Sequence, residues 1–70
     1  MRLGERVRET RRKRVLSQPE LAQRAGLTVT TLNGIETGRV SRPRPRTIRA
    51  LASALEVRAD WLVFGSDFRI

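Results

Sequence analysis

The sequence predicts an all-α fold of short helices, and three features of the chain indicate this. Apolar residues recur at helical spacing, as they do within residues 48–55. Capping residues and glycines separate these segments. The chain has 70 residues and no cysteine, so it can form one small domain without a disulfide. We expect this domain to occupy residues 1–66, with a short tail at residues 67–70.

The first predicted helix has Leu3 and Val7 on one edge, and a second helix is predicted at residues 18–25. The residues before the second helix, SQPE, form a capping box. Ser17 can accept from the backbone NH of Glu20, and Glu20 can reach back to Ser17. Gly26 stands where a C-terminal cap belongs.

The segment LTVTTLNGIE, residues 27–36, allows two interpretations. Its β-branched residues and its Asn-Gly pair are typical of a hairpin. We favour a helix at about residues 29–37, because an isolated pair of very short strands is marginal in water. Thr28 would cap this helix, and Leu32 and Ile35 would form its apolar edge. The remaining sides of the helix would carry Val29, Thr30, Thr31, Asn33 and Gly34.

Two further helices complete the prediction of five. PRTIRALASAL begins with Pro45 and places Ile48, Leu51, Ala52 and Leu55 on one face. ADWLVFG indicates a short last helix that ends at Gly65. We expect Trp61, Leu62 and Phe64 from this helix to lie mostly in the core.

The composition argues against several classes of function. The chain has no histidine and no cysteine, which removes the commonest general base, the commonest metal ligand and any thiol nucleophile. Carboxylates do not cluster, so we expect no enzyme activity, no metal and no cofactor, and no small-molecule ligand is evident. No apolar run approaches the ~20 residues that span a bilayer. The expected location is cytoplasmic.

The net charge of +8 is concentrated in two blocks. Residues 1–14 carry seven basic and two acidic side chains, and residues 39–49 carry five arginines and no acid. A solvated protein surface usually mixes charges of both signs, whereas RVSRPRPR mixes none. This distribution favours binding to a polyanion.

The two central helices joined by a glycine turn form a helix-turn-helix. LSQPELAQRAGLTVTTLNGIETG resembles the helix-turn-helix of the phage repressor and Cro family, the XRE-type regulators. LASALEVRADWLVFG resembles the end of the DNA-binding domain in lambdoid phage repressors. Together the similarity covers about residues 2–65. It implies a compact, five-helix, lambda-repressor-like domain that binds a two-fold symmetric double-stranded DNA operator as a homodimer, with its third helix in the major groove.

The resemblance also implies roles for particular residues. Positions that face base edges in relatives correspond to Val29, Thr30 and Gly34, and we add Thr31 and Asn33 as neighbouring candidates. Gln18 matches a glutamine that contacts phosphate, and Arg44 matches an arginine that enters the minor groove. Arg11 and Glu36 match a charged pair between the first and third helices. Further candidates for phosphate contacts are Arg11, Arg14, Arg39 and Arg42.

Some positions depart from the pattern of the family. Relatives often have glutamines at base-facing positions, whereas this chain has Val29, Thr30 and Gly34. Valine cannot form the bidentate bond that glutamine makes with adenine, but it can contact the thymine methyl. Val15 replaces the glycine that usually ends the first helix, and valine tolerates a left-handed conformation poorly. A different shape is therefore expected there.

The functional prediction is a sequence-specific transcriptional regulator of the repressor type. The preference for a repressor over an activator rests on the resemblance. Three alternatives stay open: a protein-docking or antitoxin-type module, a sequence-neutral DNA binder, and, least favoured, an enzyme. A large exposed apolar patch would favour docking, and equal affinity for every duplex would favour neutral binding.

Overall fold

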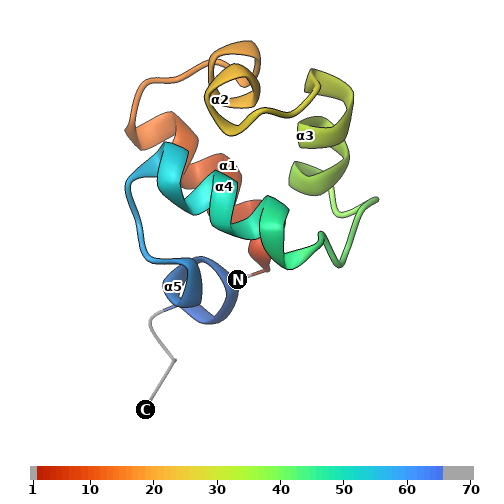
Figure 1. Ribbon diagram of the computed structural model, residues 1–70, viewed down its shortest axis with the longest axis vertical. Helices are drawn as coiled ribbons and strands as arrows, with labels where there is room; N and C mark the ends of the chain where they lie inside the picture. The colour runs from red at the N-terminus through yellow and green to blue at the C-terminus, as the bar shows by residue number, and fades with distance from the viewer. Residues whose placement is uncertain (1, 66–70) are drawn as a thin grey trace.

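The computed structural model describes residues 2–65, and within that range it contains five helices and no strand (Figure 1). The all-α prediction is confirmed. The predicted tail at residues 67–70 lies outside the described residues. No helix in the described range is long and apolar enough to cross a membrane. The helices are α1 (Leu3–Lys13), α2 (Gln18–Ala25), α3 (Val29–Glu36), α4 (Pro45–Leu55) and α5 (Ala59–Phe64).

The core lies where α1 and α4 pass through the middle of the molecule (Figure 1). Helices α2 and α3 lie on one side of this pair, and α5 lies on the other side. Every helix contributes at least one fully buried aliphatic side chain, so no helix is peripheral to the core. The largest of these side chains are Val7, Leu21, Leu32, Ile35, Leu51, Leu55 and Leu62.

The helix boundaries follow the capping residues expected from the sequence. The Ser17 hydroxyl accepts from the Glu20 NH at 3.2 Å, and a Glu20 carboxylate oxygen accepts from the Ser17 NH at 2.8 Å. The hydrogen bond from the backbone NH of Ser17 lowers the pKa of the Glu20 carboxyl below its usual value, and the Ser17 side chain lowers it further. Thr28 caps α3, so the helical interpretation of residues 29–37 is confirmed and the hairpin is excluded.

The last helix buries fewer aromatic side chains than the sequence suggested. Leu62 is fully buried and Trp61 packs against the core from a half-buried position. Phe64, however, is 56% exposed, so its assignment to the core was wrong. The helix has only six residues, and Phe64 lies two positions beyond Leu62, which turns it away from the core face.

A buried arginine holds the end of α5 against α1. Arg6 is 7% exposed and donates from Nε to the Leu62 carbonyl at 2.8 Å and from Nη2 to the Val63 carbonyl at 2.7 Å. These carbonyls lie in the last turn of α5, where the helix itself supplies no donor. A Cβ on Gly65 would lie 2.9 Å from Nη1 of Arg6, so the glycine makes room for the guanidinium.

The end of α1 keeps a left-handed residue although that residue is valine. Val15 has φ 58° and is 86% exposed, so no packing compensates for the strain at its backbone. The expected change of shape at this position is therefore not seen. Outside the glycines of the described range, Glu56 at the end of α4 is the other residue with positive φ. A left-handed conformation costs a non-glycine residue about 1–2 kcal/mol.

We predict that Val15→Gly stabilises the protein, because glycine adopts this φ without strain. The gain should be about 1 kcal/mol after the extra entropy of the unfolded glycine is subtracted. Thermal unfolding should show a Tm higher by roughly 4–8 °C. Val15→Ala is the matched control, since it removes the side chain but keeps Cβ, and it should gain much less. A lower Tm for Val15→Gly would contradict this account of the strain.

Candidate nucleic-acid interface

Helices α2 and α3 are joined by a turn of three residues with a fixed conformation. Gly26 ends α2 in the left-handed region with φ 70°, as expected from the sequence. The Leu27 NH donates to the Ala22 carbonyl at 2.8 Å, and the Thr28 hydroxyl accepts from the Thr31 NH at 3.1 Å. Each end of the turn is therefore hydrogen-bonded to a helix, which fixes the angle between α2 and α3.

The carboxylate of Glu36 joins three helices at the end of α3. Arg11 of α1 donates to it through two nitrogens, from Nε at 2.7 Å and from Nη2 at 3.0 Å. Gln18 of α2 donates to the same carboxylate from Nε2 at 3.1 Å. The Glu36 side chain is 2% exposed and the Arg11 side chain 12%. The two residues thus form the ion pair expected from the sequence, largely withdrawn from water.

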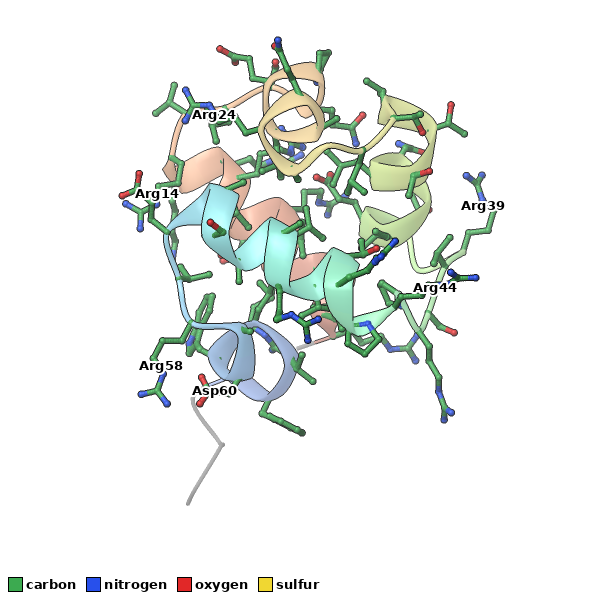
Figure 2. The ribbon with its side chains drawn as sticks, viewed as in Figure 1. Arg14, Arg24, Arg39, Arg44, Arg58 and Asp60 are labelled. Carbon is green, nitrogen blue, oxygen red and sulfur yellow. The ribbon has the colours of Figure 1, made fainter. Side chains whose placement is uncertain are left out.

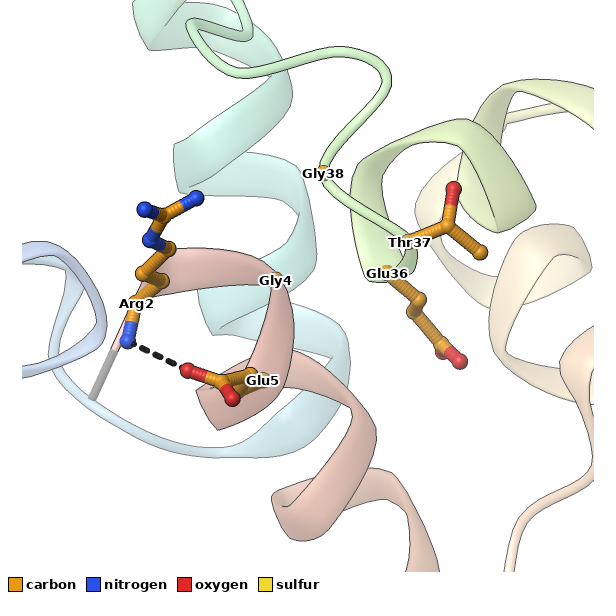
Figure 3. Close-up of a pocket in the computed structure, with 6 residues that line it drawn as sticks. All are labelled: Arg2, Gly4, Glu5, Glu36, Thr37 and Gly38. Atoms are coloured by element: carbon orange, nitrogen blue, oxygen red, sulfur yellow. Dashed lines mark hydrogen bonds between the residues drawn. The ribbon is translucent and has the colours of Figure 1, made fainter.

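The start of α1 also packs closely against the end of α3. A Cβ on Gly4 would lie 2.1 Å from the Ile35 carbonyl oxygen, closer than real atoms approach. Figure 3 shows a small pocket at this junction, where Gly4 lies beside Glu36, Thr37 and Gly38. The missing side chain at Gly4 therefore lets the backbones of α1 and α3 come together, which further fixes α3.

Helix α3 presents a short polar face to solvent. Val29, Thr30 and Thr31 are exposed, and Asn33 is half-buried. Gly34, which the resemblance matches to a base-facing position, is buried. Its burial has a local cause, because residues of the loop after α3 fold back against it.

Several of the predicted phosphate-contacting arginines lie beside α3. Arg39 and Arg44 project from the same side of the molecule as α3 (Figure 2). Both are exposed, and so is Arg42 between them. The segment from Arg39 to Arg46 contains no acid to neutralise them. Their position extends the polar face of α3 with a strongly positive edge.

Arg14 does not belong to this edge. It lies on the opposite side of the molecule from Arg39 and Arg44 (Figure 2). Its Nε donates to the Leu55 carbonyl at 3.0 Å, and its Nη2 donates to the Glu56 carbonyl at 3.3 Å. These bonds satisfy carbonyls at the end of α4, so in this structure Arg14 caps a helix. The guanidinium of Arg11 is also bonded within the protein. Its Nη1 donates to the Leu16 carbonyl at 2.9 Å, in addition to its bonds to Glu36.

The acidic side chains of residues 2–65 do not gather into groups of three that could hold a metal ion. The side chains along α3 and the following loop offer hydroxyl, amide and guanidinium groups. Such groups recognise hydrogen-bonding edges and phosphates.

Residues 2–61 match the family model of a helix-turn-helix domain. The chain belongs to this helix-turn-helix family. Two relatives come from Bacillus subtilis (strain 168). The uncharacterized HTH-type transcriptional regulator RghRB is 41% identical over 54 residues, and these cover 77% of this chain and 39% of the relative. The HTH-type transcriptional repressor RghR is 32% identical over 65 residues, and these cover 93% of this chain and 48% of the relative.

The chain therefore spans less than half the length of either relative. The arrangement of the helix-turn-helix domain is also that of a solved phage repressor. The P22 c2 repressor protein in complex with synthetic operator 9T, in the presence of Tl+, matches with a TM-score of 0.88 at 27% identity. The match covers 94% of this chain and 98% of that chain. The resemblance to phage repressors and the lambda-repressor-like fold are thereby confirmed.

We predict that Glu36→Ala destabilises the protein by about 3 kcal/mol or more, because it leaves the largely buried Arg11 charge and the Gln18 amide without their acceptor. Urea unfolding should show the loss. Arg58→Ala is the control, since it breaks an ion pair to Asp60 in which the Arg58 side chain is 73% exposed. That pair should contribute well under 1 kcal/mol. Equal effects of the two substitutions would refute the distinction.

Proposed function

We propose that this helix-turn-helix domain binds a specific double-stranded DNA sequence and acts as a transcriptional repressor. The observation that carries the proposal is the exposed polar face of α3. This face is held in a fixed position and is bordered by the arginines of residues 39–46, a segment without acidic residues. The similar proteins support it, because RghR is a transcriptional repressor and the P22 c2 repressor was solved in complex with a synthetic operator. The domain would have a binding role and no catalytic one, in the cytoplasm of a bacterium.

Helix α3 would enter the major groove, which is wide enough to accept an α-helix. The methyl groups of Val29 and Thr30 would contact thymine methyls, and the threonine hydroxyls would bond to base edges. Asn33 could form a bidentate pair with adenine. Few of these groups make forked hydrogen bonds, so we expect the shape of the DNA to supply a large share of the specificity.

Contacts to the DNA backbone would come from both sides of α3. Gln18 lies at the first position of α2, where side chain and backbone donors can meet a phosphate. Arg42 would bind phosphate from the other side, and Arg44 would reach a narrow minor groove at an A·T-rich centre. Arg11 would act indirectly by holding Glu36. We leave Arg14 out of the proposed contact set because it caps α4 on the far side.

Repression would be steric, through occupation of a promoter. We propose that two copies bind a two-fold symmetric operator with half-sites about one helical turn apart. A largely apolar hollow suited to the contact between the copies lies between α4 and α5. Its lining includes Ile48, Ala59 and Val63, together with Arg49 and Asp60. It adjoins the region around Val57–Trp61. The resemblance to phage repressors indicates that region, together with the loop before α4, for dimerisation.

Selection of bound duplexes from a random pool tests the proposal, at about 0.15 M salt so that non-specific phosphate binding is weak. We expect enrichment of a two-fold symmetric site. Binding without any enriched sequence would indicate a sequence-neutral binder. Absence of DNA binding would leave the protein-docking alternative.

We predict that Thr30→Ala and Arg42→Ala weaken binding in different ways. Thr30→Ala should reduce the preference at one or two base pairs by about 1 kcal/mol, since one hydroxyl and one methyl are lost. Arg42→Ala should weaken all sequences alike and reduce the salt slope by about 1. Titrations of the selected site and of single-base variants at several salt concentrations measure both effects. The division of roles fails if both variants flatten the same base preference.

A further prediction concerns the dimer. Val63→Asp would place a carboxylate in the apolar hollow and should abolish cooperative binding to the two half-sites while leaving affinity for one half-site unchanged. The same substitution at Val15, which is 86% exposed at the end of α1, should leave cooperativity intact. Gel-shift titrations of full and half operators separate these quantities. Undiminished cooperativity in Val63→Asp would exclude this hollow from the dimer contact.

A further inference from the structure

The polar face of α3 has a gap one turn after Thr30. Residues four apart lie next to each other on a helix surface, so position 34 continues the row that Thr30 begins. That position is occupied by glycine, which offers no side chain. The gap interrupts the surface that would read base pairs toward the end of α3.

The side chain of Arg39 lies over this gap. A Cβ on Gly34 would be 3.0 Å from Cγ2 of Val40, 3.1 Å from Nη2 of Arg39 and 3.6 Å from Nε of Arg39. The loop is fixed there, since the Val40 NH donates to the Gly34 carbonyl at 2.9 Å. Figure 2 shows Arg39 rising from the loop beside α3. The glycine therefore allows an arginine from another segment to lie against the helix.

The donors of Arg39 are available to a ligand. Its guanidinium makes no hydrogen bond or ion pair with another residue of the described range, and the residue is exposed. The guanidinium groups of Arg11 and Arg14, in contrast, are committed to protein acceptors.

We propose that Arg39 is a specificity-determining residue that replaces the side chain missing at Gly34 and recognises guanine in the major groove. The guanidinium fork fits O6 and N7 of guanine, which is the commonest specific contact of arginine with DNA. The inference rests on the proposed function, because it assigns a base to the same surface. It revises the phosphate-binding role that the sequence suggested for Arg39.

Binding-site selection with the wild type and three variants tests the inference. The wild type should prefer guanine at one position of each half-site by roughly 5- to 140-fold. Arg39→Ala should abolish that preference and leave the other positions unchanged. Gly34→Ala should weaken it at the same position, because the new Cβ displaces the guanidinium, while thermal unfolding shows that the helix is intact. Arg42→Ala, the control from the same loop, should keep the guanine preference while affinity falls for all sequences.

The outcomes separate this inference from the function on which it rests. A wild-type profile without any preferred sequence overturns both. An enriched wild-type profile that Arg39→Ala leaves unchanged, with a uniform loss of affinity, overturns the inference alone and returns Arg39 to a phosphate contact.

Discussion

The position of α3 depends on the carboxylate of Glu36. This group lies at the last residue of α3 and accepts hydrogen bonds from α1 through Arg11 and from α2 through Gln18. Its side chain is 2% exposed, so its buried oxygens need these donors to satisfy their hydrogen bonds. The backbone contact at Gly4 holds the same end of α3. A reading helix that is already fixed loses little conformational entropy when it binds, which favours affinity.

Six arginines of the described range fall into two groups with different roles. Arg6, Arg11 and Arg14 are used inside the protein, where they bond to carbonyls or to Glu36 and hold helices together. Arg39, Arg42 and Arg44 follow α3 and are exposed. The net charge therefore includes guanidinium groups that are bonded inside the protein, and fewer positive groups than it suggests could contact DNA. A domain of this size has a small core, and arginines at helix ends add long-range bonds that its few aliphatic side chains cannot provide.

Local sequence signals predicted much of the fold. The capping box at Ser17, the left-handed cap at Gly26 and the cap at Thr28 located α2 and α3, because each acts within three or four residues. Features that depend on distant segments were missed. Nothing near Arg6 or Arg14 indicates that the ends of α5 and α4 lie within reach of their guanidinium groups. The burial of Gly34 depends on the path of the following loop, and the exposure of Phe64 depends on how α5 docks on α1.

The candidate site was predictable to a similar degree. The resemblance located the polar face of α3 and the pair of Arg11 with Glu36, because the motif fixes their spacing. The resemblance could not distinguish the roles of Arg14 and Arg42, because both are arginines in basic segments. Only the fold places them on opposite sides of the molecule.

The most direct test of the account is an NMR titration of the protein with the selected duplex, following every backbone amide. The account predicts that the largest shifts occur at the start of α2, along α3 and between Arg39 and Arg46. Amides of the edge near Arg14 should change little. Shifts concentrated on the apolar hollow between α4 and α5, with α3 unaffected, would contradict the assignment of α3 as the DNA-reading helix.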